Sequence, residues 1–145
     1  MPNQNYQSKR DLFDARNFSF GQVWKLDDNE IVIPGEDHLG TRVVHKERWV
    51  VVISNNSGNY HPLCPIVTVA PLSTRTDLKR LYDLELFSTN DNVKRDCLLQ
   101  LTLSQPILKK ELYDLQGEIS DPKKVELQVL LDSYYGLETE EDTEE

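Results

Sequence analysis

Two short, β-branched apolar runs constrain the fold of this chain more than any other feature. Residues 50–53 read VVVI and residues 66–70 read IVTVA, and a polar loop at 54–61 lies between them. Such runs favour strands, and their lack of alternation predicts strands buried on both faces. If the two strands pair in antiparallel fashion, Arg48 before the first lies close to Ser73 after the second. A guanidinium beside a hydroxyl suits a phosphate group.

The rest of the chain predicts further short strands and one helix. Strand patterns cover residues 20–26, 82–87, 97–103 and 115–119. Segments 31–33 and 43–44 suggest a hairpin. Residues 105–112 include Pro106 and favour a helical turn. An i, i+3, i+4, i+7 stripe of Leu127, Leu130, Leu131 and Tyr134 predicts a C-terminal helix, with Asp121 as its cap, Pro122 in its first turn and Gly136 at its end. Because no helices alternate with the strands, we expect a mainly β fold, a small SH3-like antiparallel barrel closed by the C-terminal helix.

The length and charge of the chain indicate one domain with two appendages. Its 145 residues suffice for one core, which we assign to residues 18–137, after an N-terminal extension at 1–17. The tail at 138–145, ETEEDTEE, is expected to be disordered. It holds six of the 25 acidic side chains and no basic one, so the remainder carries 19 acidic and 16 basic side chains, a net charge of −3. This body excludes a strong non-specific nucleic-acid binder but allows a local basic groove.

Cysteine and histidine usage predicts neither a disulfide nor a metal site. Cys64 and Cys97 each lie beside apolar runs, which is typical of buried free thiols, and no Cys-x-x-Cys is present. His38, His45 and His61 lack metal-ligand spacing, so we expect no metal ion and no cofactor. The N-terminus has no signal-peptide core and no apolar run is long enough to cross a membrane, so a cytoplasmic protein is expected.

Several segments, taken in order, resemble the MazF/PemK toxins of toxin–antitoxin systems, which are related in fold to CcdB. The similar segments are Gly21-Gln22-Val23-Trp24, Arg48 followed by VVVIS, VTVAPLS at 67–73, DCLLQLTLSQPILKKEL at 96–112, Gly117-Glu118-Ile119-Ser120 and Tyr135-Gly136-Leu137. The resemblance covers residues 21–137, most of the chain. It implies the same small barrel with a closing helix.

The chain also departs from the pattern of this family. Trp49 stands where the family usually has proline, Ser73 where it has threonine, and Gln105 where it has an arginine in the second half. The loop before Arg48 is longer than is typical and lacks the usual Glu-Gln-x-Gly stretch.

The resemblance implies a metal-independent endoribonuclease toxin of a type II toxin–antitoxin system, cutting single-stranded RNA to a cyclic phosphate and a 5′-hydroxyl. Arg48 and Ser73 match the catalytic pair of the family. Thr74 and Arg75, which follow Ser73, and His45 before Arg48 are candidate RNA contacts. The implied partners are mRNA, an acidic antitoxin and a second copy of the chain. The acidic tail is then expected either to compete with RNA phosphates or simply to aid solubility.

Other interpretations stay open on the sequence. Arg48 is also explained as a strand-edge arginine paired with Glu47 or Asp96, and Ser73 as a turn residue at a strand end. At the level of the whole chain, one alternative is a CcdB-like toxin that binds a protein target and cuts nothing. The other is an inactive family member that serves as a binding module.

Overall fold

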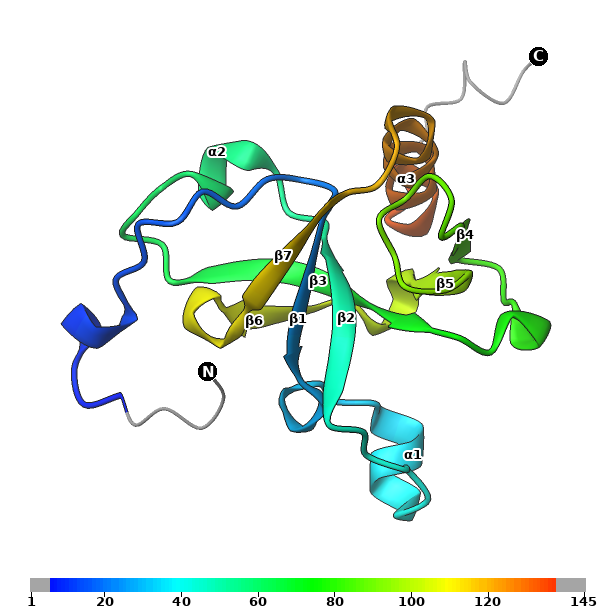
Figure 1. Cartoon of the computed structure of the whole chain (residues 1–145), viewed down its shortest axis with the longest axis horizontal. Coiled ribbons are helices and arrows are strands. Elements are labelled where there is room, and N and C mark those ends of the chain that lie inside the picture. The colour runs from blue at the N-terminus through cyan, green and yellow to red at the C-terminus, as the bar shows by residue number, and fades with distance from the viewer. Residues whose placement is uncertain (1–5, 138–145) are drawn as a thin grey trace.

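The computed structural model describes residues 6–137 and contains a seven-stranded sheet and three helices (Figure 1). The strands are β1 (Gln22–Asp27), β2 (Glu47–Val52), β3 (Ile66–Ser73), β4 (Asp83–Leu86), β5 (Cys97–Gln100), β6 (Gln105–Leu108) and β7 (Tyr113–Glu118). The helices are α1 (Pro34–Leu39), α2 (Asn56–Asn59) and α3 (Asp121–Tyr134). The predicted acidic tail at 138–145 and the first five residues of the predicted extension lie outside the described residues.

The sheet runs in the order β4-β5-β3-β2-β1-β7, with β6 paired to β3 as well, and every pairing in it is antiparallel. The predicted pair of apolar strands is confirmed as β2 and β3, which align Val50 with Pro71 and Val52 with Val69. The strand β3 is the hub of the sheet. Its first half pairs with β6, its middle with β2, and its last residues, Leu72 and Ser73, pair with β5.

The strand β2 is buried on both faces, as its unbroken apolar run predicts. Val51 and Ile53 belong to a core that α3 covers through Leu127, whereas Val50 and Val52 belong to a second core that includes Phe18. Side chains alternate along a strand, so one run of apolar residues serves two layers. The strand is therefore held from both sides, which fixes the position of its first residues.

The predicted closed barrel is wrong, because the sheet stays open between β4 and β7. The loop between β4 and β5 reaches the end of β7 through side chains instead of a backbone ladder. The Asp91 carboxylate accepts a hydrogen bond from the Ser120 N–H at 3.0 Å, and the Asn92 amide donates to the Glu118 carbonyl at 2.7 Å. The helix α3, which leaves β7 at this point, packs against β4. These side-chain contacts and the helix take the place of the strand pairs that would close a barrel.

The predicted hairpin at residues 31–44 is wrong; Pro34 begins α1 there, and Gly40 ends it in the left-handed region at φ +70°. The helical turn predicted at 105–112 is confirmed only for Lys109–Glu111. Residues 105–108 form the strand β6 despite Pro106, because this short strand pairs only with β3. Cys97 is buried, but Cys64 is only half-buried.

The predicted C-terminal helix is confirmed as α3. Leu127 is fully buried, and Leu130, Leu131 and Tyr134 pack against the same core. Ser120, one residue before Asp121, occupies the cap position, and Pro122 lies in the first turn as predicted. None of the helices within residues 6–137 is both long and apolar enough to span a membrane.

Candidate functional site

A pocket opens where β3 changes partners. The strand β3 pairs with β2 up to Pro71 and then with β5 from Leu72. Side chains from the start of β2 and the end of β3 line a pocket of about 790 Å³. The register of Val50 with Pro71 brings Arg48 to the end of β3, where its guanidinium donates to the Leu72 carbonyl at 3.1 Å.

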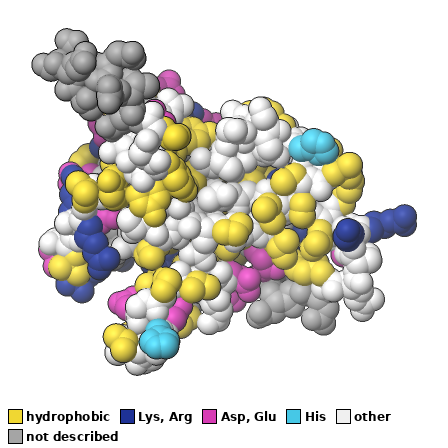
Figure 2. Space-filling model, turned by 180° about the vertical axis from the view of Figure 1, so that it is seen from behind, with side chains coloured by type: hydrophobic (Ala, Val, Ile, Leu, Met, Phe, Trp, Pro, Cys, Tyr) yellow, Lys and Arg dark blue, Asp and Glu magenta, His cyan; other side chains and the backbone are white. Residues whose placement is uncertain are grey.

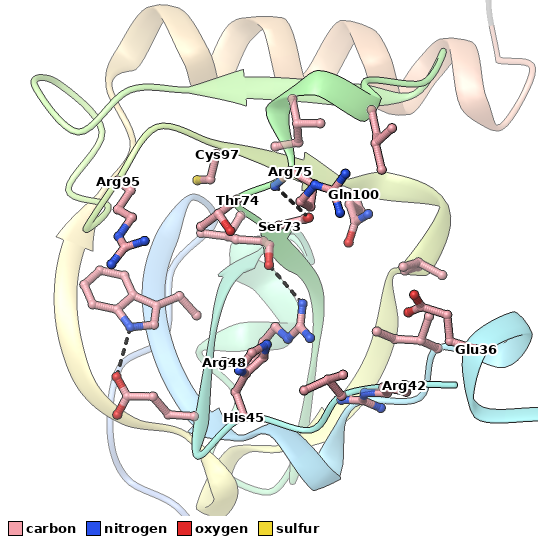
Figure 3. Close-up of a pocket in the computed structure, with 18 of the residues that line it drawn as sticks. Glu36, Arg42, His45, Arg48, Ser73, Thr74, Arg75, Arg95, Cys97 and Gln100 are labelled. Carbon is pink, nitrogen blue, oxygen red and sulfur yellow. Dashed lines mark hydrogen bonds between the residues drawn. The ribbon is translucent and has the colours of Figure 1, made fainter. Parts of the chain in front are cut away.

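The structure brings all five predicted site residues, Arg48, Ser73, Thr74, Arg75 and His45, to this one pocket (Figure 3). Ser73 and Arg75 also contact neighbouring residues. The Ser73 hydroxyl accepts a hydrogen bond from the Arg75 N–H at 3.2 Å, and the Arg75 guanidinium pairs with Asp77 at 3.1 Å. The Thr74 and His45 side chains are exposed to the pocket and to solvent.

Arg48 is not a free strand-edge arginine, and it pairs with neither Glu47 nor Asp96. Its Nε donates to Asp28 Oδ1 at 2.8 Å, Nη2 lies 3.5 Å from Asp28 Oδ2, and Nη1 donates to the Leu72 carbonyl at 3.1 Å. Only 14% of the side chain is exposed. Each terminal nitrogen carries two N–H groups, so one on each remains for a ligand in the pocket.

Asp28, which the sequence analysis did not select, organises this side of the site. Its side chain is fully buried and also accepts hydrogen bonds from Arg42 Nη2 at 2.6 Å and from the His45 N–H at 2.8 Å. Burial by itself would raise the pKa of Asp28, but the hydrogen bonds from Arg48, His45 and Arg42 outweigh it and hold the pKa below its usual value. The carboxylate is therefore ionised at neutral pH and fixes both guanidinium groups.

Three further cations that line the pocket were also missed by the sequence analysis. Arg80 precedes β4, and Lys94 and Arg95 precede β5, so the antiparallel pairing of these strands places Arg80 at the end opposite to the other two. No motif marks them, because their position at the pocket depends on how β5 pairs with the end of β3 and with β4. On the face seen in Figure 2, basic side chains gather at the edge of the molecule that carries these strands.

The departures from the expected sequence pattern have distinct positions. Gln105 does not line the pocket; its side chain accepts from the Val32 N–H at 2.9 Å and donates to the Val32 carbonyl at 3.1 Å, which fastens the segment before α1 to β6. Trp49 lines the pocket, and its indole N–H donates to Glu47 at 3.2 Å. The Lys25 ammonium group lies 5.2 Å from the centre of its ring system.

Cys97 also lines the pocket. Burial and, to a smaller extent, the negative charges of Asp91 and Asp96 raise the pKa of the Cys97 thiol to about 12. The thiol therefore stays protonated at neutral pH and is a poor nucleophile. Within the part of the chain that the structure describes, no three His, Cys, Asp or Glu side chains lie close enough together to hold a metal ion.

Comparisons with known proteins agree on one family. A family model described as a PemK-like, MazF-like toxin of type II toxin–antitoxin systems matches residues 20–133. No curated protein is recognisably similar in sequence.

Solved structures share the fold at low sequence identity. An endoribonuclease in complex with its cognate antitoxin from a mycobacterial species is 20% identical, with a TM-score of 0.60 over 83% of this chain and 97% of that chain. A second mycobacterial endoribonuclease is 18% identical, with a TM-score of 0.58 over 86% and 94% of the two chains. A MazE–MazF complex from Deinococcus radiodurans is 15% identical, with a TM-score of 0.57 over 83% and 97%.

Proposed function

Because the chain belongs to the PemK-like, MazF-like toxin family of type II toxin–antitoxin systems, we propose that it is an endoribonuclease that cleaves single-stranded RNA without a metal ion. The observation that carries the proposal is the guanidinium of Arg48, which Asp28 fixes in a pocket that Ser73 also lines. Solved structures named as endoribonucleases share the fold and add support.

The proposed reaction is an attack of the ribose 2′-hydroxyl on the adjacent phosphate. The 2′-hydroxyl gives its proton to solvent water and its oxygen bonds to phosphorus. The bond from phosphorus to the 5′-oxygen breaks, and that oxygen gains a proton from Arg48, which solvent then reprotonates. The products are a cyclic phosphate and a 5′-hydroxyl. Negative charge builds on the phosphate oxygens in the transition state, so a fixed donor aimed at them lowers the barrier.

Arg48 supplies that donor in the proposed mechanism. A guanidinium group is a poor general base. The proposed role of Arg48 is to stabilise charge and to donate a proton toward the leaving oxygen. The two N–H groups that Asp28 and Leu72 leave free fit two phosphate oxygens. Ser73 orients the phosphate through its hydroxyl, and Thr74, Arg75 and His45 contact the RNA around it.

Two partners complete the proposal. The first is a cognate acidic antitoxin, since two of the similar structures are named as toxin–antitoxin complexes. A carboxylate-rich segment suits a pocket lined by several cations. The second partner is another copy of this chain, because the family resemblance implies a homodimer.

The test is cleavage of single-stranded RNA by the purified chain with EDTA present. We expect cleavage of RNA, no cleavage of the matching oligonucleotide that lacks 2′-hydroxyls, and products that end in a cyclic phosphate. Arg48→Ala should lower the rate by about 100-fold or more. A folded Arg48→Ala variant that cuts at the wild-type rate contradicts the assignment, and a wild-type chain that cuts no RNA contradicts the proposed function.

A further inference from the structure

Lys94 and Arg95 form a cation wall in the pocket that Arg48 also lines. Both side chains are exposed, and neither forms an ion pair within residues 6–137. The full chain carries 25 acidic side chains against 16 basic ones. In so acidic a protein, exposed cations without a carboxylate partner are unexpected unless something keeps the nearby carboxylates occupied.

The carboxylates near these cations are engaged in hydrogen bonds with the backbone. Each carboxylate within three residues of the cation wall accepts a hydrogen bond from a backbone N–H. Asp96 accepts from Ser88 N at 2.9 Å, and Asp91 accepts from Phe87 N at 2.8 Å. These two acids shape the loop before β5, and neither forms an ion pair with the wall within residues 6–137.

The loop that carries Lys94 and Arg95 is also anchored on both sides. Val93 is 6% exposed and Cys97 is 3% exposed, and both belong to the core that contains Leu127. The two cations therefore stand between two buried side chains, which limits the conformational entropy that a ligand must remove. In Figure 3, Arg95 lies to one side of Ser73 and Thr74, and Arg75 lies to the other.

We infer that the cation wall is a subsite for the RNA backbone, which binds the phosphates next to the one held by Arg48 and Ser73. This inference rests on the proposed function. A strand that crosses Ser73 then meets Arg95 and Lys94 on one side, and Arg75 and Arg80 extend the positive surface elsewhere around the pocket. Contacts of this kind read no base, so they supply affinity and salt dependence and leave sequence choice to the rest of the pocket.

The test measures binding without cleavage. The probe is a labelled single-stranded decamer without 2′-hydroxyls, which the chain cannot cut. For Lys94→Gln/Arg95→Gln, we expect an affinity loss of about tenfold at low salt and a slope of log K against log [salt] reduced by about 1.4, since each single-strand phosphate contact contributes about 0.7. Lys9→Gln/Arg10→Gln, an exposed pair outside the pocket with the same change in charge, should change neither quantity.

A second measurement locates the subsite on the strand. Neutral methylphosphonate groups are placed one at a time along the decamer. Replacement of a phosphate next to the cleavage site should weaken binding to the wild type but not to the double variant, which is the coupling expected of a direct contact. On RNA, the double variant should raise KM and leave kcat within about twofold, because its contacts are equal in the ground and transition states.

The outcomes separate the two proposals. An unchanged affinity and salt slope in the double variant overturn the subsite, and so does a loss confined to an acidic polypeptide such as polyglutamate, which would assign the wall to a protein partner. If the wild type cuts no RNA but the decamer binds through Lys94 and Arg95, the endonuclease proposal fails and the subsite stands.

Discussion

The Asp28 carboxylate holds the Arg48 guanidinium from inside the protein, with Nε and Oδ1 2.8 Å apart and the aspartate fully buried. The same carboxylate binds Arg42 at 2.6 Å, so a single negative charge serves two cations. Arg42 also pairs with Asp37 at 3.2 Å, so the two positive and two negative charges of this cluster balance. Asp28 therefore orients the proposed catalytic arginine and leaves N–H groups of its guanidinium for a phosphate.

Replacement of Asp28 should affect catalysis through Arg48. In Asp28→Asn the side-chain shape is kept but the charge that orients Arg48 is lost, so we expect kcat to fall by about tenfold or more with little change in KM. The neighbouring Asp27→Asn is the control, since Asp27 accepts hydrogen bonds from Asn29 and makes none with Arg48. Steady-state kinetics on single-stranded RNA checks both variants.

Asp28→Asn also leaves the buried Arg48 guanidinium without its counter-charge, whereas Arg42 keeps Asp37 at 3.2 Å. Removal of one partner of a buried pair typically costs about 3–5 kcal/mol, so the free energy of unfolding should fall as well. Adding Arg42→Gln lowers the positive charge of the cluster by one. The double variant should regain stability but not kcat; equal recovery of both would mean that Asp28 acts only on stability.

Stability should depend on Asp28 at low pH. The folded pKa of this carboxyl lies below its usual value, and an aspartate in the unfolded chain titrates near about 3.9. The unfolded chain therefore takes up the proton first on acidification. The contribution of Asp28 is complete above the unfolded pKa and is lost as pH falls through the folded pKa. Urea unfolding between about pH 6 and pH 2 should show a shallower decline for Asp28→Asn than for the wild type.

Substitutions at the proposed catalytic pair should follow the chemistry of each side chain. Arg48→Lys should restore little activity, because an ammonium group cannot donate in a plane to two phosphate oxygens. Ser73→Thr should keep activity and Ser73→Ala should lose much of it, since the proposed role needs only the hydroxyl. Initial cleavage rates, with circular dichroism as a check on folding, decide the matter. Full activity in Ser73→Ala would remove Ser73 from the mechanism.

Burial of Leu127 on α3 should contribute several kcal/mol to the free energy of unfolding. Leu127 is fully buried between the helix and the sheet, so Leu127→Ala should lower the free energy of unfolding by about 2–5 kcal/mol. Val129 lies on the same helix and is 61% exposed, so Val129→Ala should cost well under 1 kcal/mol. Chemical denaturation compares the two. Equal losses would contradict the assigned orientation of α3.

The homodimer proposal is tested by sedimentation velocity at micromolar concentration. We expect a species of twice the mass of the 16.8 kDa chain. Pairing of two chains would place two RNA sites in one particle, as the family resemblance implies. A single species at the mass of one chain would contradict the proposal.

The sequence by itself determined the elements whose signals are local. The β-branched runs of β2 and β3, the apolar stripe of α3 and its Gly136 end depend on residues within a few positions of one another. The position of Arg48 at the end of β3 followed from antiparallel pairing of two predicted strands. The family resemblance was likewise visible in short segments, since it rests on their order.

Tertiary structure alone decided the open sheet edge, the strand β6 and the role of Asp28, because these features depend on contacts between distant residues. The open edge between β4 and β7 arises from the Asp91 and Asn92 side chains meeting the chain before α3. The strand β6 forms despite Pro106 because β3 offers it a partner. Asp28 lies 20 residues from Arg48 in the sequence, and its role appears only when the two are buried together. Burial turns an ordinary aspartate into an ion pair that orients the site, and no local pattern records burial.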